Sequence, residues 1–386
     1  MSITDDQIKL DLFCAQEVIV HADDEGHAFQ AAGDANVMPL GRRQPWPSSQ
    51  VICKPGNLSS DRLFAQSVVS PLRYPGAKRQ LVPIVEQIIR ANFPPPTLLL
   101  EPFCGGATTS LRLLGTGAVE HGILADADNL VAAFWHAAAF DTDWLIDAMN
   151  DEPVTVERWE WWRAYSAKTR RDMALKCIFL NRTTFSGILH GRAGPIGGKK
   201  QGSDAKYPID CRFNKSALAE RIAAVGELAS AGRLLDVWAC DWRESLERLR
   251  REYKKVLEPD EILVYLDPPY VDKAPYLYQW SFQDDEHGAL ASHLAEAKGY
   301  RWLLSYDDSP RIRELYPQQG NRSVLHVKHR YSAAGLKATP EGKRRRAVRE
   351  ELLVTDLPVI PSSPSYHALS DWNCDSCNMR TGPSDS

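Results

Sequence analysis

Four consecutive residues, Asp267-Pro268-Pro269-Tyr270, bring together side chains that suit chemistry on a flat ring carrying an amino group. A carboxylate accepts hydrogen bonds from such an amine, and an aromatic side chain stacks on the ring. The apolar run at residues 262–266 has the composition of a buried strand, which the two prolines end. Open α/β folds bind ligands at the carboxyl edge of the sheet, so we expect the catalytic residues Asp267, Pro268 and Tyr270 there. The same residues also suit a plain strand-ending turn.

Further candidate ligands follow two earlier strands that the sequence predicts. Glu101 precedes a glycine pair, Gly105-Gly106, at a junction of strand and helix, where glycines let the backbone approach a ligand closely. Asp126 ends the next predicted strand, the position at which doubly wound folds bind a ribose diol. Glu101 could bind a ligand ammonium and Asp126 a ribose. A ligand that carries both groups fits S-adenosylmethionine (SAM) better than NAD or ATP. Taken alone, Glu101 also suits a helix-proximal acid, and Asp126 a turn residue.

Seven short segments, taken in chain order, resemble the motifs of the Dam-type DNA adenine methylases, which are amino-methyltransferases of the alpha motif order. The segments are RYPGAK at 73–78, EPFCGGA at 101–107, LADADN at 124–129, FLNRTTFSG at 179–187, CD at 240–241, DPPY at 267–270 and LSYDDS at 304–309. The resemblance runs from about residue 72 to residue 356. Two departures stand out, because Ala77 replaces the usual second glycine and Ser186 replaces the usual asparagine.

This resemblance implies a Rossmann-like class I SAM-methyltransferase sheet with an inserted, mainly helical DNA-recognition lobe. It also implies site-specific methylation of the N6 amine of an adenine flipped out of double-stranded DNA, with SAM as the methyl donor. Asp267 and the Pro268 carbonyl would accept the two amine hydrogens, while Tyr270 would stack on the base. The residues expected to bind the cofactor are Tyr74, Lys78, Glu101, Phe103, Gly105, Asp126, Asp241 and Asp267.

Basic residues concentrate in two segments, although the chain carries a formal net charge of −4. Residues 165–215 contain eleven lysines and arginines against three acids, and residues 322–349 contain nine against one. Such blocks have the charge expected for phosphate binding, although either alone also suits an ordinary solvated face. The residues of these segments that we expect to contact DNA are Asn181, Arg182, Arg192, Lys199, Lys200, Arg344 and Arg345.

The alternation of strands, turns and helices begins near residue 72 and indicates a doubly wound α/β domain with one interruption. We assign residues 70–140 and 234–356 to the catalytic domain and residues 141–233 to an inserted target-recognition lobe. Aromatic residues at helical spacing usually belong to the core, so the lobe's tryptophan-rich helix, with Trp159, Trp161 and Trp162, is expected to pack rather than to stack on bases. Residues 1–69 form an N-terminal appendage of unknown role, and residues 357–386 a flexible tail.

Eight scattered cysteines in a chain of 386 residues indicate reduced thiols, and no apolar run reaches the length of a membrane span. The N-terminus lacks the basic start and apolar core of a signal peptide, so we expect a cytoplasmic protein. Cys374 and Cys377 offer two of the roughly four ligands that a zinc site needs, so no metal is expected. The partner expectations are a restriction endonuclease or another defence-system protein, and a monomer or weak dimer.

Other functions remain open on the residues alone. The exocyclic amine of cytosine, or of adenine in RNA, would suit the same motif, although cytosine enzymes of this kind more often carry serine before PPY. A catalytically silent DNA-binding relative is disfavoured because Lys78, Glu101, Asp126 and Asp267 are all present. A nucleotide-dependent oxidoreductase is disfavoured because the loop after Glu101 is not G-x-G-x-x-G.

Overall fold

The computed structural model describes residues 68–74, 78, 80–92, 94–202, 207–253, 255–270, 282, 284–330, 337–338, 344–345 and 348–368. The predicted N-terminal appendage, apart from residues 68 and 69, lies outside the described residues, and so do Cys374 and Cys377. The described cysteines are free thiols, as the sequence predicted. None of the helices within these ranges is both long and apolar enough to cross a membrane.

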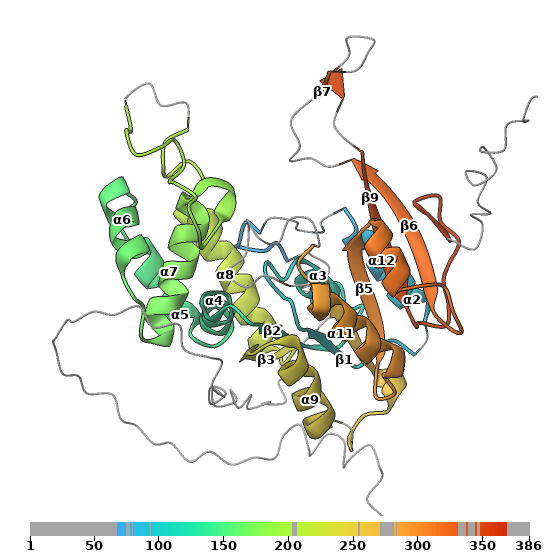
Figure 1. The fold of residues 1–386 in the computed structure, drawn as a ribbon. Coiled ribbons are helices and arrows are strands. Elements are labelled where there is room, and N and C mark those ends of the chain that lie inside the picture. The colour runs from blue at the N-terminus through green and yellow to red at the C-terminus, as the bar shows by residue number, and fades with distance from the viewer. Residues whose placement is uncertain are drawn as a thin grey trace, which may run out of the picture.

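Within the described residues, helices and strands alternate over residues 82–140 and 215–315, whereas residues 129–230 form consecutive helices and residues 323–368 consecutive strands (Figure 1). The helices are α2 (Val82–Ala91), α3 (Thr108–Gly115), α4 (Asn129–Phe140), α5 (Thr142–Asp151), α6 (Val156–Ala164), α7 (Arg170–Thr183), α8 (Lys215–Ser230), α9 (Trp242–Tyr253), α11 (Asp284–Glu296) and α12 (Pro310–Leu315), with short 3-10 turns η1 (Phe185–Gly187) and η2 (Pro259–Glu261). The strands are β1 (Leu98–Glu101), β2 (His121–Asp126), β3 (Leu234–Ala239), β4 (Ile262–Leu266), β5 (Arg301–Asp307), β6 (Ser323–Arg330), β7 (Lys337–Ala338), β8 (Arg344–Arg345), β9 (Val348–Thr355) and β10 (Tyr366–Ala368).

One mixed sheet organises the described part of the chain, with its strands in the order β10-β6-β9-β5-β4-β1-β2-β3. Strands β3, β2, β1, β4 and β5 run parallel, whereas β9 is antiparallel to β5 and to β6, and β10 is antiparallel to β6. The central strands β1 and β4 are buried along their whole length, as expected of parallel strands covered by helices on both faces. The predicted α/β class is therefore confirmed.

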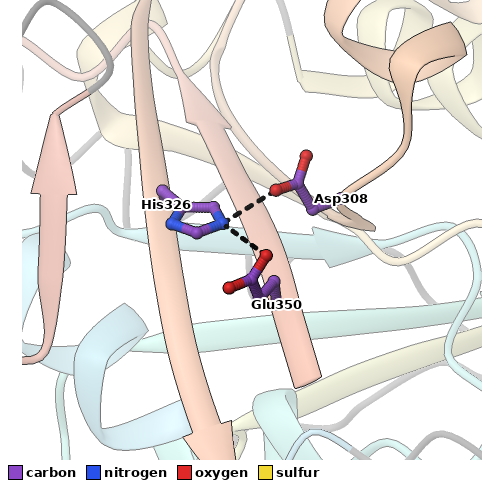
Figure 2. A group of neighbouring side chains, drawn as sticks. All are labelled: Asp308, His326 and Glu350. Atoms are coloured by element: carbon purple, nitrogen blue, oxygen red, sulfur yellow. Dashed lines mark ion pairs between the residues drawn. The ribbon is translucent and has the colours of Figure 1, made fainter. Parts of the chain in front are cut away.

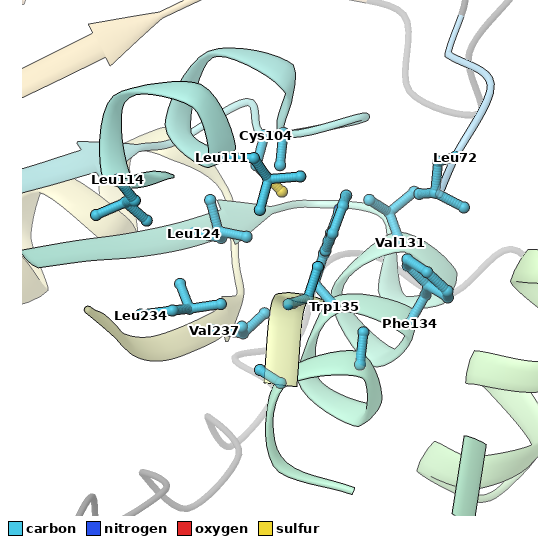
Figure 3. Packing of buried hydrophobic residues seen from close by; sticks show 14 of the residues in the cluster. Leu72, Cys104, Leu111, Leu114, Leu124, Val131, Phe134, Trp135, Leu234 and Val237 are labelled. Carbon is cyan, nitrogen blue, oxygen red and sulfur yellow. The ribbon is translucent and has the colours of Figure 1, made fainter. Parts of the chain in front are cut away.

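Two apolar clusters pack on opposite faces of the sheet, because successive residues of a strand point to opposite sides. In β4, Leu263 and Tyr265 join one cluster, while Val264 and Leu266 join the other. The first cluster extends into α3, α4, α7 and α8, and Figure 3 shows the part of it that surrounds Trp135 of α4. The second cluster lies under α9, α11 and α12. The ends of the parallel strands are thus held by a core on each side.

Helix α4 is buried almost all round and joins the sheet to the helices that follow it. Asp128 caps its first turn by accepting a hydrogen bond from the backbone N–H of Leu130 at 2.9 Å. The helix is rich in alanine, so α7 and α8 can approach it closely, and all three share the first apolar cluster. The segment 141–233 is therefore packed into the same core as the sheet, rather than around a separate core of its own.

The tryptophans of α6 mostly pack, as predicted. Trp159 and Trp162 are buried, at 6% and 2% exposure. Trp161 is 43% exposed and stacks on the ring of Tyr165, with the ring centroids 4.6 Å apart. The prediction of a packing role is confirmed for the first two, whereas Trp161 makes its contact at the surface.

The sheet extends beyond the predicted end of the catalytic domain. Strand β10 pairs with β6, and Tyr366 is buried in the first apolar cluster. Asn92 holds the intervening chain, because its side chain accepts from the N–H of Val359 at 3.0 Å and donates to the Val359 carbonyl at 2.9 Å. The segment predicted as a tail thus contributes a strand of three residues to the sheet, β10, which its serines and prolines did not indicate. Residues 369–386 lie outside the described part of the chain.

Two helical glycines give opposite expectations for the same substitution. A Cβ on Gly226 of α8 would lie 2.4 Å from Oγ1 of Thr142, whereas a Cβ on Gly288 of α11 would meet no atom within 4 Å. We expect Gly226→Ala to lower the free energy of unfolding by about 1–3 kcal/mol, because overpacking outweighs the better helix propensity of alanine. Gly288→Ala should raise it by up to about 1 kcal/mol. Urea unfolding measures both, and equal effects of the two variants would contradict this packing.

Candidate active site

The carboxyl ends of the parallel strands form one edge of the sheet, and predicted site residues gather along it. Glu101 is the last residue of β1, Asp126 is the last of β2, and Asp267 directly follows β4. These three strands are neighbours in the sheet. The structure therefore brings together three acids that are far apart in the sequence.

The loop after β1 is held by contacts of its own backbone. Gly105 has a φ of 43°, in the left-handed region that favours glycine. Its N–H donates to Asp126 Oδ2 at 2.8 Å, and its carbonyl accepts from Trp135 Nε1 at 2.7 Å. A Cβ on Gly105 would lie 2.6 Å from the ring of Tyr74, so only a glycine lets that ring lie on the loop. The predicted cofactor residues Tyr74 and Gly105 are thus in direct contact.

Glu101 is a buried acid that Ser110 holds through one carboxyl oxygen. Oε2 accepts hydrogen bonds from the backbone N–H of Ser110 at 3.3 Å and from the Ser110 hydroxyl. Burial raises the pKa of Glu101 to about 8, and the carboxylates of Asp267 and Asp126 act in the same direction. A nearby cation lowers the pKa of such a buried carboxyl group and favours its ionised form. The site therefore favours a cationic ligand.

Asp126 joins the loop after β1 to the start of α4. Its Oδ1 accepts from the N–H of Asp128 at 2.9 Å, while Oδ2 accepts from Gly105. Burial raises the pKa of Asp126 to about 7, and the charge of Asp128 adds to this. Asp128 pairs in turn with His190 in the loop after η1, at 2.6 Å between Oδ2 and Nε2. The end of β2 is therefore tied to the glycine-rich segment 187–202.

Lys78 is buried at the centre of the site, with a side chain that is 3% exposed. Its Nζ lies 3.1 Å from Asp267 Oδ1 and 3.1 Å from Glu351 Oε2, and it donates to the hydroxyl of Tyr270. Burial works against the ammonium, but Asp267, Tyr270 and Glu351 outweigh it and raise the pKa of Lys78 well above its ordinary value. Lys78 is therefore a fixed positive charge between two acids.

Asp267 is oriented by two donors on the same oxygen. Ser305 Oγ donates to Oδ1 at 3.0 Å, the atom that also faces Lys78. Ser305 is held in turn by the hydroxyl of Tyr265 at 3.0 Å. Burial raises the pKa of Asp267 to about 6, against the lowering effect of Lys78. Among the described residues, Oδ2 receives no hydrogen bond.

Two further predicted cofactor residues lie near this edge. Asp241 follows β3 and is exposed, and its Oδ1 accepts from the backbone N–H of Glu244 at 2.9 Å, which caps the start of α9. The half-buried ring of Phe103 meets that of Phe282 edge-on, with centroids 5.6 Å apart. One oxygen of Asp241 is therefore engaged in capping α9.

Asn181 and Arg182, which we expected to contact DNA, are buried at the end of α7. Asn181 Oδ1 accepts from the N–H of Arg73 at 2.7 Å, and Nδ2 donates to the carbonyls of Arg73 at 2.8 Å and Gly187 at 3.2 Å. Arg182 donates to the carbonyl of Pro71. In this conformation both side chains brace the backbone beside the site, so contact with DNA would require that backbone to open.

The other predicted DNA contacts lie at the surface or in the ribbon. Arg192, Lys199 and Lys200 are exposed in segment 187–202, and Lys199 pairs with Glu160 of α6 at 2.8 Å. The backbones of Arg344 and Arg345 form β8, which pairs with β7 in a separate two-stranded ribbon. This ribbon and segment 187–202 project from the same side of the molecule in Figure 1. An apolar ring, Phe185 in η1, is also 66% exposed beside this segment.

Two residues of the site escaped the sequence analysis, Ser305 and Glu351. Ser305 belongs to a segment that the resemblance included, but it had been given no role. Glu351 is an acid in a strand that continues as buried Leu352-Leu353-Val354, and this break in the apolar pattern was a usable sign of a buried function. Its partner Lys78 is 273 positions away, so no local pattern connects the two.

A second polar group lies at the same end of the sheet (Figure 2). His326 of β6 places its Nε2 2.7 Å from Asp308 Oδ2 and 3.5 Å from Glu350 Oε2. These residue types can bind a metal ion. However, Arg313 already donates to both oxygens of Asp308, each at 2.6 Å. We therefore interpret the group as an ion-pair network that fastens β6 and β9 to the end of β5.

The model of one protein family matches residues 74–192 and 244–333, which together make up more than half of the chain. Its description is D12 class N6 adenine-specific DNA methyltransferase. The matched segments contain Glu101, Asp126 and Asp267, whereas Asp241 and Glu351 fall outside them. A comparison with curated proteins gave no match.

Glu101→Gln tests the buried acid through the pH dependence of stability. Because the pKa of Glu101 is raised to about 8, the folded chain binds this proton more tightly than the unfolded chain. The resulting stabilisation is complete below the unfolded pKa and is lost as the pH rises through about 8. Between about pH 5 and pH 8, the free energy of unfolding of the wild type should fall by at least about 1 kcal/mol more than that of Glu101→Gln.

Urea unfolding of the ligand-free protein at each pH provides the measurement. Glu247→Gln, at an exposed position of α9, is the matched control and should keep the wild-type slope. A Glu101→Gln variant with the same slope as the wild type would show that Glu101 is ionised at neutral pH.

Proposed function

Because the chain belongs to the D12 class of N6 adenine-specific DNA methyltransferases, and is thus an enzyme that methylates adenine in DNA, we propose that it takes the methyl group from SAM and acts on a base flipped out of double-stranded DNA. The observation that carries the proposal is the orientation of Asp267, whose Oδ1 is held by Ser305 and Lys78, on the sheet edge that also holds Glu101 and Asp126. The family assignment favours adenine in DNA over cytosine, over adenine in RNA and over nucleotide-dependent oxidation.

We assign the sheet to the Rossmann-like class I SAM-methyltransferase type. The parallel order β3-β2-β1-β4-β5, with candidate ligands after β1, β2 and β4, supports this assignment. Residues 70–140 and 234–368 would then form the catalytic domain, and residues 141–233 would recognise the target. Residues 357–368 are included because β10 belongs to the same sheet.

The residues at the ends of β1 and β2 fit SAM. When bound, SAM supplies an electrophilic methyl group on a sulfonium, and it also carries an ammonium and a ribose diol. Glu101 would ionise against the ammonium, which its burial and its raised pKa favour. Asp126 would accept from the ribose hydroxyls. Phe103 and Asp241 would border the adenine of the cofactor.

The Asp267 carboxylate would activate the target amine. The lone pair of this amine is delocalised into the adenine ring, so the amine is a poor nucleophile. Asp267 Oδ2 and the Pro268 carbonyl would accept its two hydrogens and draw the nitrogen toward tetrahedral geometry. Because Ser305 and Lys78 fix Oδ1, the carboxylate is oriented before the substrate arrives, and much of the rate would come from positioning.

Tyr270 would stack on the flipped base, as the resemblance implies. Its hydroxyl accepts from Lys78, and Nζ of Lys78 lies 4.4 Å from the centroid of its ring. The residue is only 8% exposed. The ring, or the residues packed on it, would therefore have to move before a base could stack on it. Lys78 would then connect the stacking residue with the hydrogen-bonding residue Asp267.

DNA would lie across the carboxyl edge of the sheet. The ribbon β7–β8 extends from β6 and β9 beyond the pair Arg330 and Val348, while β9 pairs Glu351 with the last residue of β5. Segment 187–202 is tied to the end of β2 by the His190–Asp128 pair. The two basic elements thus flank the edge, where lysines and arginines would hold phosphates and the exposed Phe185 would contact bases.

Asp267→Asn is the direct test of the proposed function. Asparagine keeps the shape but accepts less strongly, so we expect kcat to fall by about a thousandfold, within the range seen for positioned acids and bases. Binding of S-adenosylhomocysteine should stay within about threefold, because we expect this product to bind mainly through the residues at the ends of β1 and β2. Transfer of tritium from labelled SAM to DNA and calorimetry measure the two quantities.

Asp260→Asn is the matched control, because Asp260 is an exposed acid just before the opposite end of β4. It should keep the wild-type rate. Full activity of Asp267→Asn would overturn the assignment of the catalytic residue, whereas a wild type that methylates no adenine would overturn the proposed function itself.

Neutralising the ribbon tests the DNA surface. The double substitution Arg344→Ala and Arg345→Ala should weaken binding to all duplex sequences alike, because contacts to phosphate carry no base information. The slope of log affinity against log salt should fall by about 0.9 for each lost phosphate contact. Arg250→Ala with Arg251→Ala removes the same charge from α9, which lies at the opposite end of the view in Figure 1, and should change neither quantity. An altered target sequence would contradict a phosphate role.

A further inference from the structure

The buried ammonium of Lys78 is shared between two carboxylates rather than paired with one. Nζ lies 3.1 Å from Asp267 on one side and 3.1 Å from Glu351 on the other. The side chain of Glu351 is only 5% exposed, so this acid is as deeply placed as the lysine. A buried acid has a high desolvation cost, which makes its position beside the catalytic motif a feature that requires a function.

An ammonium has three donors, and each donor of Lys78 has an acceptor in the site. The acceptors are Asp267 Oδ1, Glu351 Oε2 and the hydroxyl of Tyr270. Without the hydrogen bond from Lys78 to Glu351, the ammonium would interact more strongly with Asp267. The lysine would then compete with the substrate amine for the carboxylate that must accept from it.

The net charge of the three residues also indicates a role for Glu351. Asp267, Lys78 and Glu351 together carry one net negative charge when ionised. Methyl transfer places positive charge on the amine nitrogen, which a negative site stabilises and a neutral site does not. Without Glu351, the remaining pair of Asp267 and Lys78 would be neutral.

Strand geometry fixes Glu351 in place. Strand β9 lies between β5 and β6, and Glu351 pairs with Asp307 on one side and Val327 on the other. Its neighbour Glu350 points to the opposite face, where it meets His326 (Figure 2). The carboxylate of Glu351 therefore reaches Lys78 from a central strand and not from a loop.

On the basis of the proposed function, we propose that Glu351 is a positioning residue for methyl transfer. It anchors the ammonium of Lys78 and balances its charge, so that the lysine does not neutralise the charge of Asp267 or compete for the oxygen that would accept from the amine of adenine. It acts through Lys78 and does not itself touch the base.

The titratable groups that influence Asp267 come from five parts of the fold. They are Lys78 before α2, Glu101 on β1, Tyr265 and Tyr270 on and after β4, Tyr306 on β5 and Glu351 on β9. Burial and the charge of Glu351 on β9 raise the pKa of Asp267, and Lys78 lowers it, with the result that this pKa lies at about 6. Loss of its charge should therefore move the ionisation of Asp267 to lower pH.

The test compares Glu351→Gln with Glu350→Gln, which removes the same charge from the adjacent position on the opposite face. Glu351→Gln should lower kcat by about tenfold, the effect of one charge acting over roughly 10 Å in a protein, with KM for DNA within about twofold. The acidic limb of the profile of kcat/KM against pH should shift to lower pH. Glu350→Gln should keep the wild-type values of all three quantities.

A double-mutant cycle with Lys78→Gln shows whether the effect passes through the lysine. In the Lys78→Gln background, Glu351→Gln should cause a much smaller further loss of kcat than in the wild type. The same tenfold loss in both backgrounds would overturn the proposal, and so would a wild-type rate and pH profile in Glu351→Gln.

A structural role for Glu351 makes a different prediction. It would lower the urea midpoint and the affinity for S-adenosylhomocysteine together with kcat, while leaving the pH limb in place, and this outcome would also overturn the proposal. Failure of the inference remains distinct from failure of the proposed function, because the wild-type protein and Asp267→Asn report on the latter in the same assay.

Discussion

The site depends on one buried cation. Lys78 precedes α2, Asp267 and Tyr270 follow β4, and Glu351 lies on β9, so the ammonium joins three distant parts of the chain. A buried charge is tolerated only when it is paired and hydrogen-bonded, so these segments can adopt their places only together. The position of the Asp267 carboxylate is therefore set by an electrostatic requirement as much as by the sheet.

Around this cation, side chains of the segment 141–233 hold the backbone of the site in place. Asn181 holds the backbone of Arg73 on one side and of Gly187 on the other, which joins the residue before Tyr74 to the start of segment 187–202. The His190–Asp128 pair makes a second connection, to the end of β2. The segment that would read DNA and the edge that would bind the cofactor thus share supports, and neither can shift without strain on the other.

Most of the sheet and one side of the site were predictable from sequence, because they follow from local patterns. The strands that end at or just before Glu101, Asp126 and Asp267 are short apolar runs. Strand β10 was not predictable, because its order comes from pairing with β6 and not from its own composition. Likewise, Asn181 is a residue type that often contacts DNA, but in the fold its side chain is buried against the backbone of Arg73 and Gly187. The role of Glu351 was not predicted, because its ion-pair partner Lys78 is 273 residues away in the sequence.

The placement of Glu351 has a consequence for synthesis. A chain leaving the ribosome exposes Lys78 early, and one of the two acids that balance it appears only near the end of β9, close to the last strand of the sheet. Domains generally fold from the N-terminus as they emerge, so a partly made sheet would hold an ammonium without its full complement of charge. The centre that would perform the chemistry is therefore among the last parts of the domain to be completed.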